Sequence, residues 1–288
     1  MKDFHTLEDF NFKDKTVLLR VDINCPLDKG TLEIINDSRI RRVVPTVREL
    51  IGKQAKVVIL AHQSRKGKWD FTSLEQHSHR LSKHLNSPVK YVDDVMGDKA
   101  KAAIKAIRPE IKVGLTLSLH DLQSLPGGES FAEAAWDEEF RHYLPYIEGD
   151  DFLGVQNYTR TQYSPQGQLP APKDAELTQM QYEFYPEALE HVIRRVREDF
   201  KGDLIVTENG IAVSDDTRRV EFIRRAVSGV QNCIADGIPV KGYFYWSLMD
   251  NFEWQKGYSM TFGLIAVDRA TMERTPKESL SVLGSYAR

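Results

Sequence analysis

Cysteine is scarce in this sequence of 288 residues, because only Cys25 and Cys233 are present. They lie far apart and outside any CxxC or Cys/His pattern, so they can build neither a disulfide framework nor a structural zinc site. We expect two buried free thiols, no metal site and no cofactor.

Long apolar runs are missing as well. No stretch approaches the roughly 18 apolar residues that a membrane helix needs, and the N-terminus has no basic segment followed by an apolar one. These absences predict no export and no membrane partner, and they leave a cytoplasmic location as the expectation. The content of 41% hydrophobic and 10% aromatic residues is ordinary for a globular core.

The net charge of -3 conceals an asymmetry between the two ends of the chain. Residues 1–110 carry 21 Lys and Arg against 15 Asp and Glu, a net of +6, and the rest carry 18 against 27, a net of -9. The positive charge is not gathered into a basic cluster with interleaved aromatic residues, and no nucleic-acid motif occurs. Nucleic acid is therefore not an expected partner.

Short apolar runs alternate with charged stretches of helical period along the whole chain, which is the pattern of repeated βα units. The first third is expected to contain strands at 16–23, 56–61 and 89–92 and helices at 38–52, 74–85 and 99–107. The remainder is expected to contain strands at 112–119, 152–157, 204–207 and 240–246 and helices at 129–144, 186–200 and 217–236. The pattern predicts an α/β fold, and we place the domain boundary between residues 1–109 and 110–288.

Glu208 follows the apolar strand 204–207 and precedes Asn209 and Gly210. Its carboxylate is therefore expected at the C-terminal end of a strand, beside a tight turn, where α/β barrels place their chemistry. Considered alone, a Glu before Asn-Gly is more often an ordinary loop acid. The neighbouring motifs decide between these two interpretations.

Trp246 and Trp254 stand near the end of another predicted strand, and Glu253 lies between them. Indole rings stack on the apolar faces of sugars, and carboxylates accept hydrogen bonds from sugar hydroxyls. A core aromatic cluster would not need an acid between two tryptophans. Asn157 and Tyr158 add an amide and a phenol at the end of strand 152–157, so Asn157 joins the candidate substrate-binding residues.

Residues from about 111 to 288 resemble the C-terminal half of a family 1 glycoside hydrolase, the β-glucosidase family. The resemblance rests on segments 112–117, 151–158, 206–210, 246–254, 263–269 and 274–277. It implies strands five to eight of a (β/α)8 TIM-type barrel and a small-molecule β-glycoside as substrate. It further implies that Glu208 is the nucleophile of a retaining mechanism, that Tyr158 hydrogen-bonds it, and that Trp246, Glu253 and Trp254 hold the sugar.

Retaining hydrolysis needs two carboxyl groups about 5 Å apart, a nucleophile and an acid. The family carries the acid in an Asn-Glu-Pro motif after its fourth barrel strand, and no Asn of this chain is followed by Glu. Barrel strands one to four also have no counterpart. We therefore expect turnover of ordinary glucosides to be impaired or absent.

A second group of polar residues lies in the first third of the chain. Asp22 and Asn24 end one predicted strand, Arg39 begins a helix, and His62 and Arg65 follow the next strand. Such a group suits a small anion, because Arg donates two hydrogen bonds to a phosphate or carboxylate. Charges on a helix surface and a strand-end cap explain the same residues about equally well.

Residues 1–109 resemble the N-terminal segment of phosphoglycerate kinase, closest to the archaeal type, through segments 20–24, 37–40, 61–65 and 70–75. The resemblance implies a partial Rossmann-like parallel βα segment in which Asp22, Asn24, Arg39, His62 and Arg65 bind 3-phosphoglycerate. The nucleotide-binding domain has no counterpart, and no glycine-rich phosphate loop occurs. Kinase activity is therefore not expected.

Two architectures stay open at this point. We favour one continuous mixed α/β body; the alternative is two half-domains whose open parallel edges another copy would cover as a homo-oligomer. The leading functional hypothesis is a β-glucosidase-like hydrolase with impaired turnover. The alternatives are a non-functional, designed or misassembled fusion of two enzyme fragments, and a 3-phosphoglycerate-binding module without kinase activity.

Overall fold

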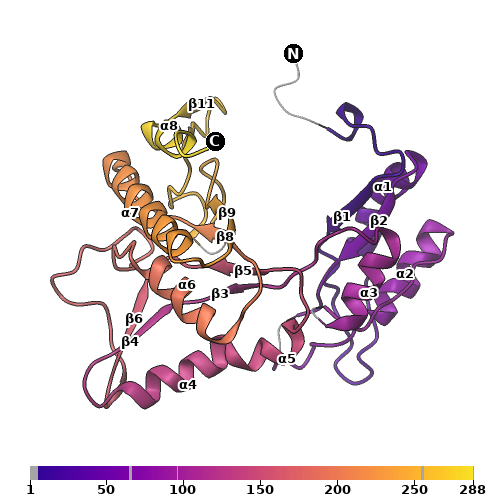
Figure 1. Cartoon of the computed structure of the whole chain (residues 1–288). Helices are drawn as coiled ribbons and strands as arrows, with labels where there is room; N and C mark the ends of the chain where they lie inside the picture. Colours follow the sequence, from indigo (N-terminus) through magenta and orange to yellow (C-terminus); the bar gives the residue numbers. More distant parts are fainter. Residues whose placement is uncertain (1–5, 65–66, 96, 254–255, 288) are drawn as a thin grey trace. The chain divides into compact units, whose positions relative to one another are not determined.

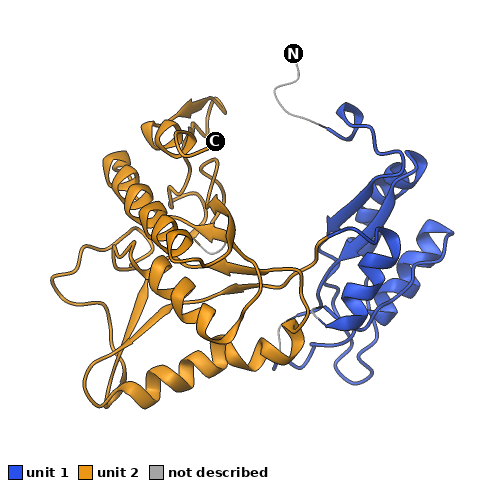
Figure 2. Ribbon diagram, in the orientation of Figure 1, with its two compact units in different colours: residues 1–111 blue, residues 112–288 orange. Residues whose placement is uncertain are grey.

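The chain folds as two compact units, residues 1–111 and 112–288, which Figure 2 distinguishes by colour. A computed structural model describes residues 6–64, 67–95, 97–253 and 256–287. Within these ranges, no helix is both long enough and apolar enough to cross a lipid bilayer.

The described residues of unit 1 form a parallel strand pair, three α-helices and one short 3-10 helix. Its elements are η1 (Leu7–Asp9), β1 (Thr16–Arg20), α1 (Ser38–Gly52), β2 (Lys56–Leu60), α2 (Glu75–Leu85) and α3 (Asp98–Ile107). β1 and β2 pair in parallel, with Val17 opposite Val57. Ile40 and Val47 of α1 and Leu81 of α2 are buried in the core of this unit.

Residues 89–92 do not form the strand that their β-branched and aromatic side chains predict. The backbone N–H of Val89 donates to the hydroxyl of Ser82 at 2.9 Å. A side chain of α2 therefore takes a donor that a neighbouring strand would have used. The prediction of a strand here was wrong.

A buried polar group lies inside unit 1 around Gln63. The Gln63 side chain accepts from the backbone N–H of Cys25 at 2.9 Å and donates to the Cys25 carbonyl at 3.0 Å. His77, which is 1% exposed, lies with Nε2 3.0 Å from the same Gln63 oxygen. Burial lowers the pKa of His77 to about 4, so this imidazole is neutral in the folded unit at neutral pH.

Unit 2 is organised around a parallel sheet with the strand order β3-β5-β8-β9. These strands are β3 (Thr116–Ser118), β5 (Leu153–Gln156), β8 (Leu204–Asn209) and β9 (Val240–Tyr245). The helices α6 (Ala188–Asp199) and α7 (Asp216–Ala235) cover one face of this sheet (Figure 1).

The other elements of unit 2 surround this sheet. They are β4 (Asp121–Ser124), α4 (Glu129–Glu139), η2 (Arg141–Tyr143), α5 (Leu144–Ile147), β6 (Arg160–Ser164), β7 (Gly167–Gln168), β10 (Ile265–Val267), β11 (Arg274–Pro276) and α8 (Glu278–Gly284). β4, β6 and β7 form a second small sheet, and β10 and β11 form an antiparallel pair. These five strands were not predicted from the sequence.

The helix predicted over residues 129–144 is three short helices instead. α4 ends at Glu139, and Pro145 lies in the first turn of α5. The chain leaves the α-helical region at Phe140, where φ is -132°, and Pro145 has no backbone N–H to donate to the Arg141 carbonyl.

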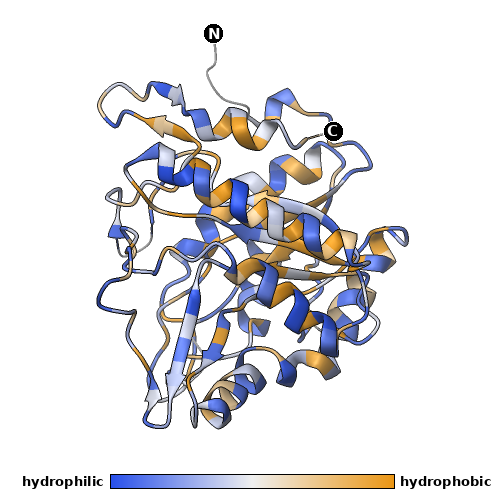
Figure 3. Cartoon of the chain, turned by 60° about the vertical axis from the view of Figure 1, so that its left-hand side comes forward, coloured by the Kyte–Doolittle hydropathy of each residue, from blue (hydrophilic) through white to orange (hydrophobic). Residues whose placement is uncertain are grey.

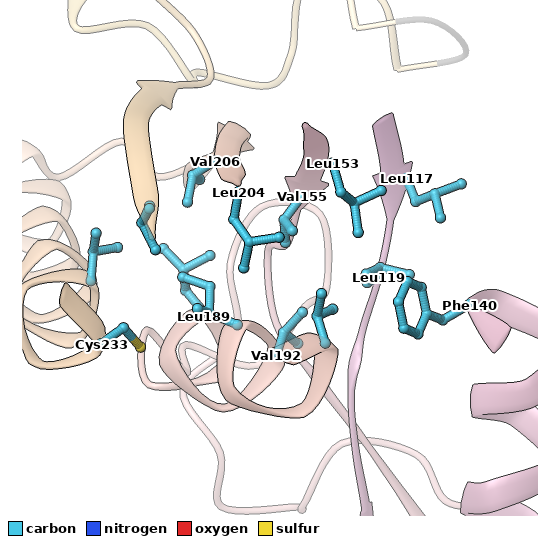
Figure 4. Packing of buried hydrophobic residues seen from close by; sticks show 14 of the residues in the cluster. Leu117, Leu119, Phe140, Leu153, Val155, Leu189, Val192, Leu204, Val206 and Cys233 are labelled. Carbon is cyan, nitrogen blue, oxygen red and sulfur yellow. The ribbon is translucent and has the colours of Figure 1, made fainter. Parts of the chain in front are cut away.

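The core of unit 2 lies between the sheet and the helices that cover it. Leu153 and Val155 of β5 alternate toward this core, as do Leu204 and Val206 of β8, and they meet Leu189 of α6 (Figure 4). The helices carry hydrophobic and hydrophilic residues in alternating patches along their length, as Figure 3 shows. Each of these large apolar side chains contributes about 1.5–3 kcal/mol when fully buried. The prediction of an α/β fold from repeated βα units is confirmed.

The opposite face of the sheet carries a polar pair bridged across a glycine. The hydroxyls of Thr116 in β3 and Thr207 in β8 lie 2.5 Å apart, across the intervening strand β5. A Cβ at Gly154 of β5 would lie 2.5 Å from the Thr116 hydroxyl and 2.9 Å from the Thr207 methyl. Only glycine leaves room for this contact.

A candidate active site at the ends of β8 and β9

Glu208 is partly exposed near the C-terminal end of β8, and a bulge sets its direction. Val155 of β5 pairs with Val206, but the next residue, Gln156, pairs with Glu208, so Thr207 is an extra residue in β8. With strict alternation, Glu208 would point to the same face as buried Val206. The bulge re-aims the carboxylate, as bulges next to active sites often do.

Tyr158 is the hydrogen-bond partner of Glu208. Its phenol donates to Oε2 of the carboxylate at 2.6 Å. Burial raises the pKa of Tyr158, and the hydrogen bond to Glu208 raises it further, so the phenol keeps its proton and acts as a donor. The ring of Phe262 packs edge-on against that of Tyr158, with centroids 6.1 Å apart. Within the described part of the chain, the other carboxylate oxygen, Oε1, accepts no hydrogen bond.

Asn157 is 1% exposed, and its side chain holds strand ends together. Its amide nitrogen donates to the carbonyls of Leu119 and Thr159, both at 3.0 Å. The backbone carbonyl of Asn157 accepts from the side-chain nitrogen of Asn209 at 2.7 Å. The Tyr243 hydroxyl in turn donates to the side-chain oxygen of Asn209 at 2.8 Å. The sequence predicted substrate contact for Asn157, whereas both hydrogens of its amide nitrogen are committed to the backbone.

Glu253 is a second carboxyl near Glu208. It is 9% exposed, and its Oε2 has no hydrogen-bond partner among the described residues. Burial raises the pKa of Glu253, a hydrogen bond from the Trp246 side chain opposes this rise, and the charge of Glu208 adds to it. Trp246 therefore lies in contact with Glu253, and Glu253 lies close enough to Glu208 to feel its charge. Trp254 falls outside the described residues.

A close approach of two backbones fixes Trp246 beside the end of β8. The Trp246 N–H donates to the Asn209 carbonyl at 2.9 Å. A Cβ at Gly210 would overlap the carbonyl oxygen of Trp246. Glycine after Asn209 is thus required by packing and not by a turn alone.

A buried ion pair that the sequence did not suggest anchors the loop that carries Glu253. Lys277 donates to both carboxylate oxygens of Asp250, at 3.2 and 3.3 Å, and to the Gly263 carbonyl at 2.6 Å. The Gly263 N–H donates back to Asp250 at 2.7 Å. Burial lowers the pKa of Lys277. Asp250 and Lys277 both lie in segments that carry the family resemblance, and this was the only sequence feature that could have pointed to the ion pair.

The predicted anion-binding residues of unit 1 gather at the C-terminal ends of β1 and β2. Arg39 Nη1 donates to Asp22 Oδ2 at 2.6 Å, and the Asn24 N–H donates to Asp22 Oδ1 at 3.1 Å. Burial alone would raise the pKa of Asp22, but these hydrogen bonds and the charges of Arg39 and His62 lower it. Arg65 falls outside the described residues.

Two family models match this chain in different places. The model described as phosphoglycerate kinase matches residues 7–119, and the model described as glycosyl hydrolase family 1 matches residues 139–287. The phosphoglycerate kinase of Methanobacterium bryantii is 48% identical over 123 residues, which are 43% of this chain and 29% of that enzyme. The chain thus spans less than a third of this kinase relative.

Solved structures show the same fold over most of the chain. The beta-glycosidase BGL167 is 37% identical with a TM-score of 0.66, covering 87% of this chain and 66% of that one. A beta-glucosidase, number 1317, is 33% identical with a TM-score of 0.65, covering 95% and 73%. The predicted chimera of a kinase-like N-terminal part and a β-glycosidase-like C-terminal part is confirmed.

Proposed function

The chain belongs to glycosyl hydrolase family 1 over residues 139–287, and from this premise we propose that unit 2 attacks β-glycosides through Glu208. The observation that carries the proposal is the hydrogen bond of 2.6 Å from Tyr158 to Oε2 of Glu208. It fixes the carboxylate at a strand end and leaves Oε1 for the substrate. Glu253 and Trp246 supply an acceptor and an apolar ring surface for the sugar.

In the first step, Oε1 of Glu208 forms an ester bond to the anomeric carbon. The bond from that carbon to the leaving oxygen breaks, and its electron pair departs with the leaving group. In the second step, water attacks the anomeric carbon, the ester bond breaks, and the carboxylate is restored while the water proton passes to solvent. Tyr158 orients the carboxylate in both steps and, as a hydrogen-bond donor, stabilises it when it is charged.

Protonation of the leaving oxygen would be the weak step. No Asn of the chain is followed by Glu, so the acid motif that the family resemblance implies has no counterpart. General acid catalysis typically contributes about 10²–10⁴-fold to the rate. We therefore propose that unit 2 forms the covalent intermediate mainly from glycosides whose leaving groups need no proton.

The test is covalent capture with a 2-fluoro glycoside that carries dinitrophenolate as leaving group. Intact mass spectrometry should show one added sugar, and peptide mapping should place it on Glu208. Glu208→Gln should remove the label, whereas Glu273→Gln, a change at an exposed acid on the surface of unit 2, should not. An unlabelled wild-type protein would show that no competent sugar site exists.

A second candidate function is binding of a small anion such as 3-phosphoglycerate by unit 1. It is favoured by the gathering of Asp22, Asn24 and Arg39, with His62 close enough to lower the pKa of Asp22. Calorimetric titration with 3-phosphoglycerate should give a heat that Arg39→Ala removes and that Arg42→Ala, on the exposed side of the same helix, leaves unchanged. Absence of heat with the wild-type chain would dispose of this function.

A further inference from the structure

Strand β3 is an edge of the main sheet, because its only ladder within the described ranges is the one with β5. The Leu119 N–H donates to the Gln156 carbonyl at 2.8 Å, so the odd-numbered residues of this segment turn their backbone groups toward β5. Parallel geometry then directs the backbone groups of Thr116 and Ser118 the opposite way. Both residues are exposed. The edge thus presents donors and acceptors at the spacing that an added strand needs.

A cleft of about 550 Å³ opens beside this edge. It is lined by all three residues of β3 together with side chains of α4, η2 and β6, namely Ala135, Glu138, Glu139, Tyr143 and Tyr163. The volume lies within the range that accommodates ligands in proteins. A strand added to β3 would therefore find room for one of its long side chains next to the sheet.

The cleft is negatively charged. Glu138 is exposed, and no hydrogen bond or ion pair from the described residues neutralises it. Glu139 accepts from the ring nitrogen Nδ1 of His120 at 3.1 Å and from the His120 backbone N–H at 3.0 Å. Burial raises the pKa of Tyr163, and the charges of Glu139 and Glu138 raise it further. A cation beside these carboxylates and phenol rings would be stabilised by both.

We propose that the edge of β3 and this cleft form a docking site for an extended, basic segment of another polypeptide. The segment adds to the sheet as a strand next to Thr116 and Ser118, which provides backbone hydrogen bonds. It places a lysine or arginine between Glu138 and the two tyrosine rings, which provides selectivity. The charge of the cleft argues for a basic partner over an acidic or purely apolar one. The site shares no residue with the Glu208 centre and does not depend on glycoside cleavage.

The experiment uses the full chain and a fluorescein-labelled hexapeptide of alternating valine and lysine. Its fluorescence polarisation should rise on titration with the protein. A glutamate-for-lysine version tests the charge, and a version with alternate backbone nitrogens methylated tests strand addition. Loss of two backbone hydrogen bonds should weaken the methylated peptide about thirtyfold, which corresponds to about 2 kcal/mol.

Two protein variants and a matched control locate the site. Glu138→Gln should weaken the basic peptide about threefold, as expected for an exposed ion pair. Ser118→Pro removes a backbone N–H from the open edge and should weaken it about fivefold or more. Glu129→Gln, an exposed acid at the start of the same helix α4, should leave binding unchanged. If Ser118→Pro fails to fold, the methylated peptide still tests strand addition and Glu138→Gln still tests the contribution of charge.

Three results would overturn the proposal. The first is no binding of the basic peptide below millimolar protein, and the second is equal binding of the methylated peptide, which would mean charge attraction alone. The third is a dimer in sedimentation that Glu138→Gln or Ser118→Pro converts to monomer, since a second copy would then be the occupant of this edge.

Discussion

Tyr158 and Glu208 stand 50 positions apart in the sequence, yet the phenol oxygen of one lies 2.6 Å from Oε2 of the other. They come from the ends of neighbouring strands, Tyr158 after β5 and Glu208 within β8. The contact depends on the bulge at Thr207, which turns Glu208 away from the core face. The proposed nucleophile is thus positioned by a strand irregularity and held by one hydrogen bond.

Replacement of Tyr158 by Phe should slow the formation of the covalent intermediate without preventing it. A hydrogen bond to a charged group is worth about 1.5–3 kcal/mol, which corresponds to roughly tenfold to hundredfold in rate. The rate of dinitrophenolate release from the 2-fluoro glycoside measures the effect. An unchanged rate would show that Tyr158 does not act on Glu208 during the reaction.

The rate of hydrolysis should depend steeply on the leaving group. Without a positioned acid, each increase in the pKa of the departing phenol leaves more uncompensated charge on its oxygen. A series of substituted phenyl glycosides measures kcat/KM against phenol pKa. A flat dependence would contradict the proposal, because it would require an acid elsewhere in the site.

Gly154→Ala should destabilise unit 2 by about 1–3 kcal/mol, the usual cost of forcing an extra methyl into a packed site. Its Cβ would lie 2.5 Å from the Thr116 hydroxyl. Gly242→Ala is the matched control in the same sheet, because its Cβ would meet Ile205 at 3.6 Å, an ordinary contact. Urea unfolding followed by tryptophan fluorescence compares the two. Equal stability of both variants would mean that β5 shifts freely to make room.

Unit 1 should lose stability in acid because of His77. The pKa of this buried imidazole is about 4 in the folded unit, against an ordinary value of 6.5. The unfolded chain binds a proton first, so the stabilisation is complete above pH 6.5 and is lost as the pH falls toward 4. The difference corresponds to about 3 kcal/mol at most.

His77→Gln keeps a side-chain N–H for Gln63 without a titrating group, so it should flatten this pH dependence. Limited proteolysis of unit 1 in urea at pH 7 and pH 4.5 measures it. His79→Gln, a change at an exposed position on the same helix, serves as control and should retain the wild-type response. A wild-type response in both variants would place the acid sensitivity elsewhere in unit 1.

Local patterns sufficed for the fold class and for the two resemblances, because apolar periodicity and contiguous motifs are written directly in the sequence. The strand expected at 89–92 does not form, since the Val89 N–H donates to the hydroxyl of Ser82 in α2, and the β-type composition of the segment does not encode this side-chain partner. The strand carrying Glu208 was expected, but not the bulge that aims it. The backbone contacts of the Asn157 side chain could not be predicted either, since the sequence beside a strand end does not show whether an amide faces a ligand or the backbone.

The Thr116–Thr207 hydroxyl pair changes the polarity of the face of the main sheet that lies opposite α6 and α7. A closed barrel would bury this face. In an open sheet the same face usually exposes apolar side chains that can associate with other chains. Here two hydroxyls and an adjacent glycine replace what could have been a continuous aliphatic strip, so water can wet part of the surface. Such wetting lowers the tendency of an exposed sheet face to aggregate.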